Sequence, residues 1–417
     1  MAFLYNLFIY FYFLSILIAS VFNKKAAKWI SGRKDIFNKL KKEIPSDKKI
    51  VWFHCASLGE FEQGRPLIES FKEKNPDYKI LLTFFSPSGY EIRKNSVDAD
   101  YVFYLPLDIR KNAKKFIELV KPDFAVFVKY EFWFNYISFL HKKSIPVFFI
   151  SALFRPNQHF FKWYGTWFRK MLGKITFFFV QNSESVELLK SININKVLIS
   201  GDTRFDRVYN ISLQKKSFPL IEKFKGDSDI FIAGSTWQPD ENLIYDLLNQ
   251  TFENLKFIIA PHLVDKSHID SIIKKCTKKT LLFSEATDKN INDAEVLIID
   301  SIGILNNLYQ YSKIAYIGGG FGVSIHNIQE AATFSNPVIF GPNYHKFDEA
   351  KDLIKLEGAF CVNNSDELIE ITKQLMTDFE FYKKCSQASR NYIEEKRGAT
   401  EIILKKIQEL SHNKQLK

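Results

Sequence analysis

Cysteine is scarce in this sequence, and two common nucleotide-binding patterns are absent. The 417 residues include only four cysteines, Cys55, Cys276, Cys361 and Cys385. None of them forms a C-x-x-C pair, which excludes zinc-ribbon and thioredoxin-like motifs. So few thiols in so long a chain do not make a disulfide scaffold, and we expect a reducing compartment. The P-loop pattern G-x-x-x-x-G-K-[ST] and the dinucleotide pattern G-x-G-x-x-G are not matched.

Extreme composition is lacking as well. Hydrophobic residues make up 46% and charged residues 25% of the chain, which excludes a wholly disordered chain, a collagen-like repeat and a polytopic membrane protein. Lysine and arginine (58) exceed aspartate and glutamate (47) by 11, and such an excess favours an anionic partner. The charges are spread rather than clustered, so a lysine-rich proteome is the alternative explanation. Because RRM, KH and basic-aromatic signatures are missing, no nucleic-acid partner is expected.

The amino terminus carries no charge before a long apolar run, Phe3 to Phe22. Twenty helical residues span about 30 Å, the thickness of a bilayer core. A signal peptide would begin with basic residues, whereas the basic residues here follow the run, from Lys24 to Lys34. This pattern predicts a membrane anchor at residues 1–22 with the body of the chain in the cytoplasm, and the basic flank is expected to attract anionic lipid. A full span, insertion into one leaflet and a very apolar core helix all stay open.

The rest of the chain alternates short apolar runs with amphipathic stretches. Such alternation predicts a parallel sheet that is covered by helices on both faces. A stretch poor in apolar residues, 210–228, separates two similar halves. We therefore expect an α/β fold with two Rossmann-like domains facing a cleft, at residues 23–215 and 216–417. Ligands of such sheets bind beyond the carboxyl ends of the strands.

The first candidate site follows the strand-like run that ends in His54 and Cys55. Glu60 begins the next helix there, where the helix dipole keeps a carboxylate ionised, and it is a candidate general base. An ordinary glutamate of a first helical turn is the alternative. Neighbouring strand residues point to opposite faces, so His54 and Cys55 do not make a catalytic pair.

Two further motifs are weaker on their own. The segment from Lys129 to Asn135 places charges among aromatic rings after a strand, which fits sugar recognition or a structural salt bridge. The turn formed by Gly234, Ser235 and Thr236 leads into a helix, where it presents N–H groups to a phosphate or merely caps the helix.

The fourth motif is a glycine turn, Gly318 to Gly320, followed by Phe321 and then by the run His326 to Glu330. Consecutive glycines bring backbone amides close to a ligand phosphate, and Glu330 is placed to accept hydrogen bonds from a ribose. A packing turn is the alternative. Asp98 and Asp100 form a D-x-D pattern, but it precedes a strand and lacks further ligands, so we predict no essential metal.

Taken in order, these motifs resemble the Kdo transferases of lipopolysaccharide synthesis, where Kdo is 3-deoxy-D-manno-octulosonic acid. The resemblance covers essentially the whole chain. It rests on H-x-x-S-x-G-E, Y-L-P-x-D, E-x-W-x-N, G-[ND]-x-[KR]-F-D, H-N-x-x-E and G-P-N, matched at residues 54–60, 104–108, 131–135, 201–206, 326–330 and 341–343. The chain departs from the family in lacking an arginine between Pro261 and His262.

The resemblance implies a GT-B fold and an inverting transfer of Kdo from CMP-Kdo to a lipid A precursor, without a metal or other cofactor, at the cytoplasmic face of the inner membrane. Glu60 would be the general base. Substrate binding would fall to Ser57, Gly59, Glu131, Arg155 and Arg204. Nucleotide binding would fall to Ser235, Thr236, His262, Gly318, Gly319, Gly320, Phe321, His326, Asn327 and Glu330. A GT-B enzyme with another nucleotide sugar and a membrane-anchored nucleotide- or RNA-binding module are the alternatives.

Overall fold

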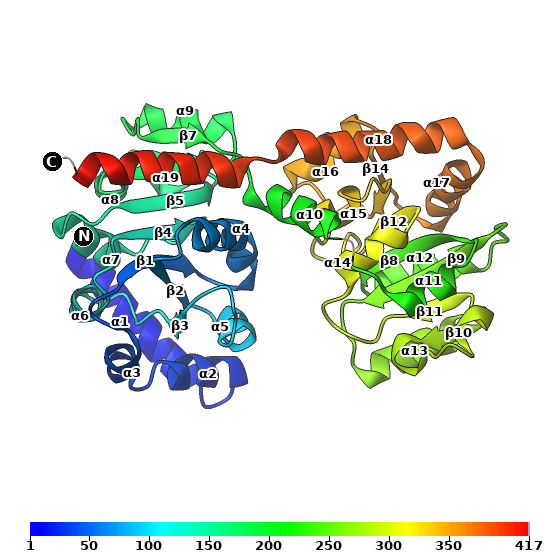
Figure 1. The fold of residues 1–417 in the computed structure, drawn as a ribbon, viewed down its shortest axis with the longest axis horizontal. Coiled ribbons are helices and arrows are strands. Elements are labelled where there is room, and N and C mark those ends of the chain that lie inside the picture. Colours follow the sequence, from blue (N-terminus) through cyan, green and yellow to red (C-terminus); the bar gives the residue numbers. More distant parts are fainter. Residues whose placement is uncertain (215, 416–417) are drawn as a thin grey trace. The chain divides into compact units, whose positions relative to one another are not determined.

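The computed structural model describes residues 1–214 and 216–415, which form two compact units. The first unit comprises Met1–Arg207 and Arg397–Lys417, and the second comprises Val208–Lys396. Each unit is built on a parallel sheet of seven strands with helices on both faces (Figure 1). The expected α/β fold with two Rossmann-like domains of the GT-B type and an apolar amino-terminal helix is confirmed.

The first sheet has the strand order β3-β2-β1-β4-β5-β6-β7. Its strands are β1 (Lys49–Cys55), β2 (Tyr78–Phe84), β3 (Tyr101–Tyr104), β4 (Phe124–Val128), β5 (Val147–Ala152), β6 (Phe177–Val180) and β7 (Val197–Ile199). The chain builds outward from β1 in one direction and from β4 in the other. The neighbouring strands β1 and β4 therefore form the switch point at which ligands of such sheets bind.

Helices cover both faces of this sheet. They are α1 (Ala2–Ala19), α2 (Lys24–Gly32), α3 (Ile36–Glu43), α4 (Leu58–Lys74), α5 (Pro87–Arg93), α6 (Arg110–Val120), α7 (Phe134–Lys142), α8 (Thr166–Leu172), α9 (Ser183–Ser191), α19 (Ala399–Gln415) and the short η1 (His159–Phe161). Helix α10 (Thr203–Leu213) leads out of the unit. Because strand residues alternate between faces, Trp52 joins one core cluster and its neighbours Val51 and Phe53 join the other.

Helix α1 packs against the first unit, although the sequence had set residues 1–22 apart as a separate anchor. The Tyr5 hydroxyl donates to Asp108 Oδ2 at 2.5 Å, and Asn135 Nδ2 donates to Asn6 Oδ1 at 3.1 Å. Ile9 is buried in a small apolar cluster with Trp29. The other side of α1 is apolar and exposed, so the helix combines a docked face with a face that no described residue covers.

The second sheet has the order β10-β11-β9-β8-β12-β13-β14, so β8 and β12 form its switch point. Its strands are β8 (Asp229–Thr236), β9 (Leu255–Pro261), β10 (Thr280–Leu282), β11 (Val296–Ile298), β12 (Ile314–Ile317), β13 (Val338–Phe340) and β14 (Ala359–Cys361). Its helices are α11 (Pro219–Lys225), α12 (Gln238–Leu248), α13 (Lys266–Lys275), α14 (Leu305–Leu308), α15 (Gln329–Ala332), α16 (Asp348–Lys355), α17 (Ser365–Thr377), α18 (Phe379–Lys396) and the short η2 (Phe283–Glu285), η3 (Ile291–Asp293) and η4 (Tyr309–Tyr311).

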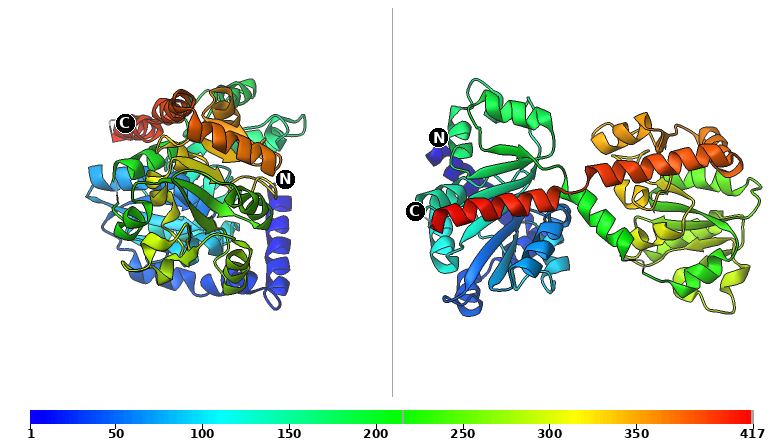
Figure 2. Two further views of the ribbon diagram at one scale, coloured as in Figure 1. Left: turned by 90° about the vertical axis from the view of Figure 1, so that its right-hand side faces the viewer. Right: turned by 45° about the horizontal axis from the view of Figure 1, so that its top comes forward.

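The chain returns to the first unit at its end, which differs from the expected domain at 216–417. Ile403, Leu404 and Ile407 of α19 are buried in the core of the first unit, along which α19 runs in both Figure 1 and Figure 2. The carboxylate of Asp206 accepts hydrogen bonds from the backbone N–H and the hydroxyl of Thr400 at 2.7 and 2.6 Å. The aspartate of the F-D step at residues 205–206 therefore caps α19, a long-range role that the local sequence does not reveal.

Candidate functional site

Glu60 and Ser57 lie at the start of α4, directly beyond the end of β1. The Ser57 hydroxyl accepts the N–H of Gly59 at 3.2 Å and donates to Glu60 Oε2. Ser57 thus caps the helix and fixes the carboxylate with the same oxygen. Glu60 is partly exposed, and Oε1 has no hydrogen-bond partner among the described residues. The predicted base is therefore held by one oxygen and has the other available.

Glu131 lies beyond β4, on the other side of the same switch point. Its Oε2 accepts the indole N–H of Trp133 at 2.8 Å and lies 3.3 Å from Nε2 of the fully buried His54. Nδ1 of His54 lies 2.9 Å from the Thr83 hydroxyl. The His54 imidazole and the Trp133 indole therefore hold the Glu131 carboxylate in one place. Sequence reasoning did not assign His54 and Trp133 this role, although both occupy positions of the quoted motifs.

The thiol beside His54 takes no part in this network. Cys55 is fully buried, and burial raises the pKa of its thiol well above the usual value. A thiol of that kind is a poor nucleophile at neutral pH. The structure therefore agrees with the prediction that His54 and Cys55 do not form a catalytic pair.

The two predicted arginines differ in what engages them. The Arg204 guanidinium donates to Asp202 Oδ2 at 2.9 Å. Burial by itself would raise the pKa of Asp202, but the charge and hydrogen bonds of Arg204, helped by Lys129, bring that pKa below its usual value. Arg204 therefore neutralises a buried acid. The Arg155 guanidinium is exposed and makes no hydrogen bond or ion pair with the described residues, so it has its full charge to offer a ligand.

These charged groups gather around one tyrosine. Burial raises the pKa of Tyr130, the charges of Asp202 and Glu60 raise it further, and those of Arg155 and Arg204 lower it. Groups that act on one hydroxyl in this way share one neighbourhood. The structure thus brings Glu60, Arg155 and Arg204 together at the carboxyl edge of the first sheet.

The glycine turn of the second unit is built differently from the expectation. The N–H of Gly318 donates to the Gly234 carbonyl at 2.9 Å, and the N–H of Gly319 donates to Asp240 Oδ2 at 2.9 Å. A Cβ on Gly318 would lie 2.4 Å from the Ser235 carbonyl oxygen. These two glycines therefore allow the ends of β8 and β12 to pack closely, and their amides do not point to a ligand. The amides of Gly320 and Phe321 have no hydrogen-bond partner among the described residues.

Asp240 lies at the carboxyl edge of the second sheet, and the sequence analysis did not single it out. This fully buried carboxylate also accepts the N–H of Trp237 at 2.9 Å and the hydroxyl of Tyr316 at 2.9 Å. It therefore ties the turn after β8 to the turn after β12. Asp240 is the third residue of a helix that follows a strand. An acid at that position commonly caps its own helix, so the local sequence does not indicate that this one also joins two turns.

Three rings stack beside this turn. The ring of His262 stacks on both Trp237 and His326 with ring-centroid distances of 4.6 Å to each, and Trp237 Nε1 donates to His326 Nε2 at 3.1 Å. Burial, together with the charge of His262, lowers the pKa of His326 to about 4. His326 is therefore neutral at physiological pH. Because its Nε2 accepts a hydrogen bond, its own N–H is on Nδ1.

The remaining predicted nucleotide ligands lie around the same edge. Asn327 Nδ2 donates to Glu330 Oε1 at 3.2 Å, and Glu330 is in the first turn of α15. The Thr236 hydroxyl donates to the buried Glu241 at 3.2 Å, which occupies it internally. Ser235 has a left-handed backbone (φ 54°), and its hydroxyl makes no hydrogen bond with the described residues. Of these groups, Ser235 and Glu330 are the better placed to meet a ligand.

The D-x-D acids serve the structure of the first unit. Asp98 is 7% exposed and lies 3.4 Å from Arg65, while Asp100 accepts Lys79 at 2.9 Å and the N–H of Ile80 at 2.9 Å. Both carboxylates, which lie in the loop that precedes β3, are therefore engaged in ion pairs and hydrogen bonds. Among the side chains that the structure describes, no three of His, Cys, Asp or Glu converge as metal ligands would.

Residues 31–207 match the family described as 3-deoxy-D-manno-octulosonic-acid transferase (kdotransferase). The chain is 29% identical over 347 residues to the 3-deoxy-D-manno-octulosonic acid transferase of Aquifex aeolicus, covering 81% of this chain and 89% of that protein. It is 26% identical over 364 residues to that of Haemophilus influenzae, covering 85% of each. The resemblance inferred from the motifs is confirmed.

Solved structures with low sequence identity show the fold alone. UDP-GlcNAc 2-epimerase from Neisseria meningitidis aligns with a TM-score of 0.62 at 18% identity, over 87% of this chain and 100% of that one. MurG from Acinetobacter baumannii aligns with a TM-score of 0.54 at 11% identity, over 87% and 99%. Both support the two-domain arrangement of parallel sheets that the sequence predicted.

Proposed function

We propose that this protein, whose resemblance to the Kdo transferases extends over most of its length, is an inverting glycosyltransferase that moves Kdo from CMP-Kdo to a lipid A precursor. The observation that carries the proposal is the pair of carboxylates at the switch point of the first sheet. Glu60 is held by Ser57 beyond β1, and Glu131 is held by Trp133 beyond β4. The relatives named above support Kdo as the transferred sugar.

Glu60 is the general base in this proposal. Its free Oε1 takes the proton from an acceptor hydroxyl as that oxygen forms a bond to the anomeric carbon of Kdo. The bond from that carbon to the CMP phosphate breaks on the opposite face, and its electron pair leaves with the phosphate. Proton removal by a positioned base contributes roughly 10²- to 10⁴-fold to the rate.

Glu131 and Arg155 bind rather than react. A carboxylate fixed by an indole N–H is pre-organised to accept hydrogen bonds from sugar hydroxyls, which reduces the entropy lost on binding. Arg155 offers a free guanidinium to a carboxylate or phosphate of either substrate. Arg204 contributes indirectly, because it keeps Asp202 ionised and paired next to Tyr130.

The donor is bound by the second unit. The unpartnered amides of Gly320 and Phe321 are donors for the leaving phosphate, and the free hydroxyl of Ser235 is a third. Glu330 accepts from the ribose hydroxyls. The stack of Trp237, His262 and His326 presents an aromatic surface with which a pyrimidine ring packs favourably. Of the four residues that the sequence predicted for this turn, Gly320 and Phe321 keep the role of phosphate donors, whereas the amides of Gly318 and Gly319 are occupied within the protein.

The protein works at the cytoplasmic face of the inner membrane in this proposal and needs no metal. Helix α1 is 18 residues long with a mean hydropathy of 2.0, enough by length and composition to cross a membrane. An acceptor with acyl chains is presented at a bilayer surface, so an apolar helix docked on the acceptor-binding unit keeps enzyme and acceptor together.

Mass spectrometry of the products tests the proposal. The full chain in detergent is incubated with CMP-Kdo and a lipid A precursor, and in parallel with UDP-sugars. We expect a product heavier by one or more Kdo residues from CMP-Kdo alone. Glu73→Gln is the matched control for Glu60→Gln, because Glu73 is an exposed acid on the same helix. Product from a UDP-sugar, or none from CMP-Kdo, contradicts the proposal.

A further inference from the structure

Two cavities lie on either side of Tyr10, between α1 and α6. The basic groove has a volume of about 620 Å³, and its polar and charged lining consists of Asn6, Tyr10, Arg110, Lys111, Lys114 and Lys142. The apolar cavity has a volume of about 410 Å³. Tyr10 borders both, so the two cavities follow each other along the same helices.

The basic groove gathers positive charge that the described side chains leave largely unneutralised. Arg110, Lys111 and Lys142 are exposed and have no ion-pair partner among those side chains. Lys114 reaches only Glu118, at 4.0 Å, and no acidic residue lines the groove. Arg110 and Lys111 also occupy the first turn of α6, where the positive end of the helix dipole makes cations unfavourable. A site of this kind gains from a bound anion.

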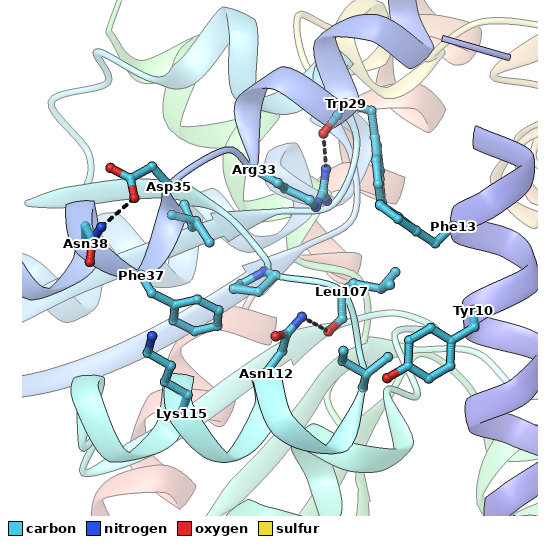
Figure 3. A pocket seen from close by; sticks show the side chains of 13 residues that line it. Tyr10, Phe13, Trp29, Arg33, Asp35, Phe37, Asn38, Leu107, Asn112 and Lys115 are labelled. Carbon is cyan, nitrogen blue, oxygen red and sulfur yellow. Dashed lines mark hydrogen bonds between the residues drawn. The ribbon is translucent and has the colours of Figure 1, made fainter. Parts of the chain in front are cut away.

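The apolar cavity continues the groove with hydrocarbon and rings. Figure 3 shows Phe13 of α1 facing Trp29, with Leu107 and Phe37 between that pair and α6 below. Arg33 also lines the cavity, and its guanidinium donates hydrogen bonds to the carbonyls of Leu105 and Phe85 at 2.8 and 2.7 Å. The lining is therefore mostly apolar: its other charged members, Asp35 and Lys115, are exposed, and the Arg33 guanidinium is already satisfied by the protein.

We propose that these cavities bind one anionic phospholipid of the bilayer, with its phosphate on the basic groove and an acyl chain passing Tyr10 into the apolar cavity. The charge of the groove fits a phosphodiester, and the apolar continuation excludes free phosphate as the natural occupant. On the lipid-facing side of α1, Phe3, Phe8 and Phe11 are 77%, 65% and 59% exposed. A phospholipid beside α1 would extend that surface and hold the helix on the unit.

This site is separate from the proposed reaction. Neither cavity is lined by Ser57, Glu60, Glu131 or Arg155. The inference rests on the proposed membrane location of α1 and is independent of the identity of the donor sugar. Its failure is therefore distinguishable from failure of the proposed function, because product formation and phospholipid binding are measured separately.

Vesicle flotation with the full chain tests the groove. Vesicles contain phosphatidylcholine alone or phosphatidylcholine with phosphatidylglycerol. A groove variant carries three substitutions, Arg110→Gln, Lys111→Gln and Lys142→Gln. A control variant of equal charge carries three substitutions of exposed lysines elsewhere on the same unit, Lys74→Gln, Lys190→Gln and Lys196→Gln.

We expect the groove variant to lose about 10- to 100-fold in affinity for the anionic vesicles and the control variant to lose far less, since each basic residue at a lipid surface contributes on the order of 1 kcal/mol. Equal losses in both variants would mean general surface attraction and would overturn the proposal. The rate on a short-chain soluble acceptor should be the same in the groove variant and the wild type. A raised acceptor KM in that variant would assign the groove to the acceptor instead and also overturn the proposal.

Fluorescence quenching tests the apolar cavity. Phosphatidylglycerol brominated on its acyl chain should quench the wild type more than it quenches Trp29→Phe, because Trp29 lines the cavity. Trp163→Phe is the control, since Trp163 is 88% exposed and lies outside the cavity. If Trp29→Phe and Trp163→Phe lose the same share of the quenching, no acyl chain occupies the cavity.

Discussion

The two units each have a parallel sheet of seven strands, but they build opposite kinds of binding edge on it. At the switch point of the first sheet, the acids Glu60 and Glu131 are partly exposed and each is held through one oxygen. At the switch point of the second sheet, Asp240 is fully buried and accepts three hydrogen bonds. One fold thus places an acid where it can exchange a proton in one unit and where it only joins two turns in the other.

The difference follows from how many donors surround each carboxylate. An acid that is buried among three donors has no oxygen left for a substrate, and removing it strands those donors. An acid that is held through one oxygen, as Glu60 is, keeps the other oxygen for a substrate. The proposal therefore places proton transfer in the first unit and rigid binding of the donor in the second, and the following experiments test that contrast.

Glu60→Gln is expected to have the largest effect. Loss of the base should lower kcat by roughly 10²- to 10⁴-fold, while the melting temperature and the affinity for CMP stay near those of the wild type. Calorimetric titration with CMP and a product assay measure both. If Glu60→Gln turns over as fast as Glu73→Gln, Glu60 is not the base and the contrast between the units collapses.

Asp240→Ala should act on stability instead. It leaves the Trp237 and Gly319 amides and the Tyr316 hydroxyl without their acceptor, and we expect a loss of about 2–4 kcal/mol in the free energy of unfolding, with weaker CMP binding. Thermal denaturation measures it, with Glu253→Ala as a control at an exposed acid of the same unit. An unchanged melting temperature would show that the turns hold without this tie.

Gly319→Val should also destabilise the second unit rather than only block a ligand. Gly319 has a φ of +92°, and a Cβ there would lie 2.4 Å from the Ser324 carbonyl oxygen. Both the strain and the close contact arise without any nucleotide bound. A variant that melts like the wild type but no longer binds CMP would restore the interpretation of Gly319 as a phosphate contact.

The two units should respond to pH in opposite directions. Burial raises the pKa of Asp108 in the first unit to about 6, although its hydrogen bonds oppose this. The native state therefore holds that proton more tightly, and the first unit loses up to about 3 kcal/mol as pH rises from 4 to 6. His326 in the second unit has its pKa lowered to about 4. The unfolded state binds that proton more tightly, so stability rises over the same range, by about 1 kcal/mol after allowance for solvent screening.

Urea denaturation between pH 4 and 7 measures these slopes, with amide hydrogen exchange to separate the units. Asp108→Asn should flatten the slope of the first unit, and His326→Gln should flatten that of the second. Parallel slopes in the two units would contradict the assignment of either group.

Trp133→Phe should have the smallest effect. It removes the N–H that fixes Glu131 and leaves an aromatic ring in place, so we expect about a tenfold lower kcat/KM for the acceptor, the value of one hydrogen bond. The melting temperature should not change. Trp163→Phe is the control at an exposed tryptophan. An unaltered kcat/KM would mean that Glu131 needs no help from the indole.

The sequence predicted what depends on local pattern. The apolar runs became the strands, and the residues that follow them lie at the carboxyl edges as expected. Ser57 and Glu60 are three residues apart at a helix start, so their contact could be anticipated. The sequence did not reveal pairs that only the folded chain brings together, such as Asp240 with Gly319, or His54 with Glu131. It also overestimated the glycine turn, because glycines needed for close packing look the same as glycines needed for a ligand.

The return of α19 to the first unit has a consequence for how this protein is made. Ile403, Leu404 and Ile407 complete the core of that unit, yet they leave the ribosome only after the whole of the second unit. The second unit is continuous in the chain and has all of its strands before the first unit receives its final helix. The early segment of the first unit therefore keeps part of its apolar surface uncovered until α19 has been synthesised. Premature termination before residue 397 would release a chain in which the later half closes and the earlier half stays open to proteolysis.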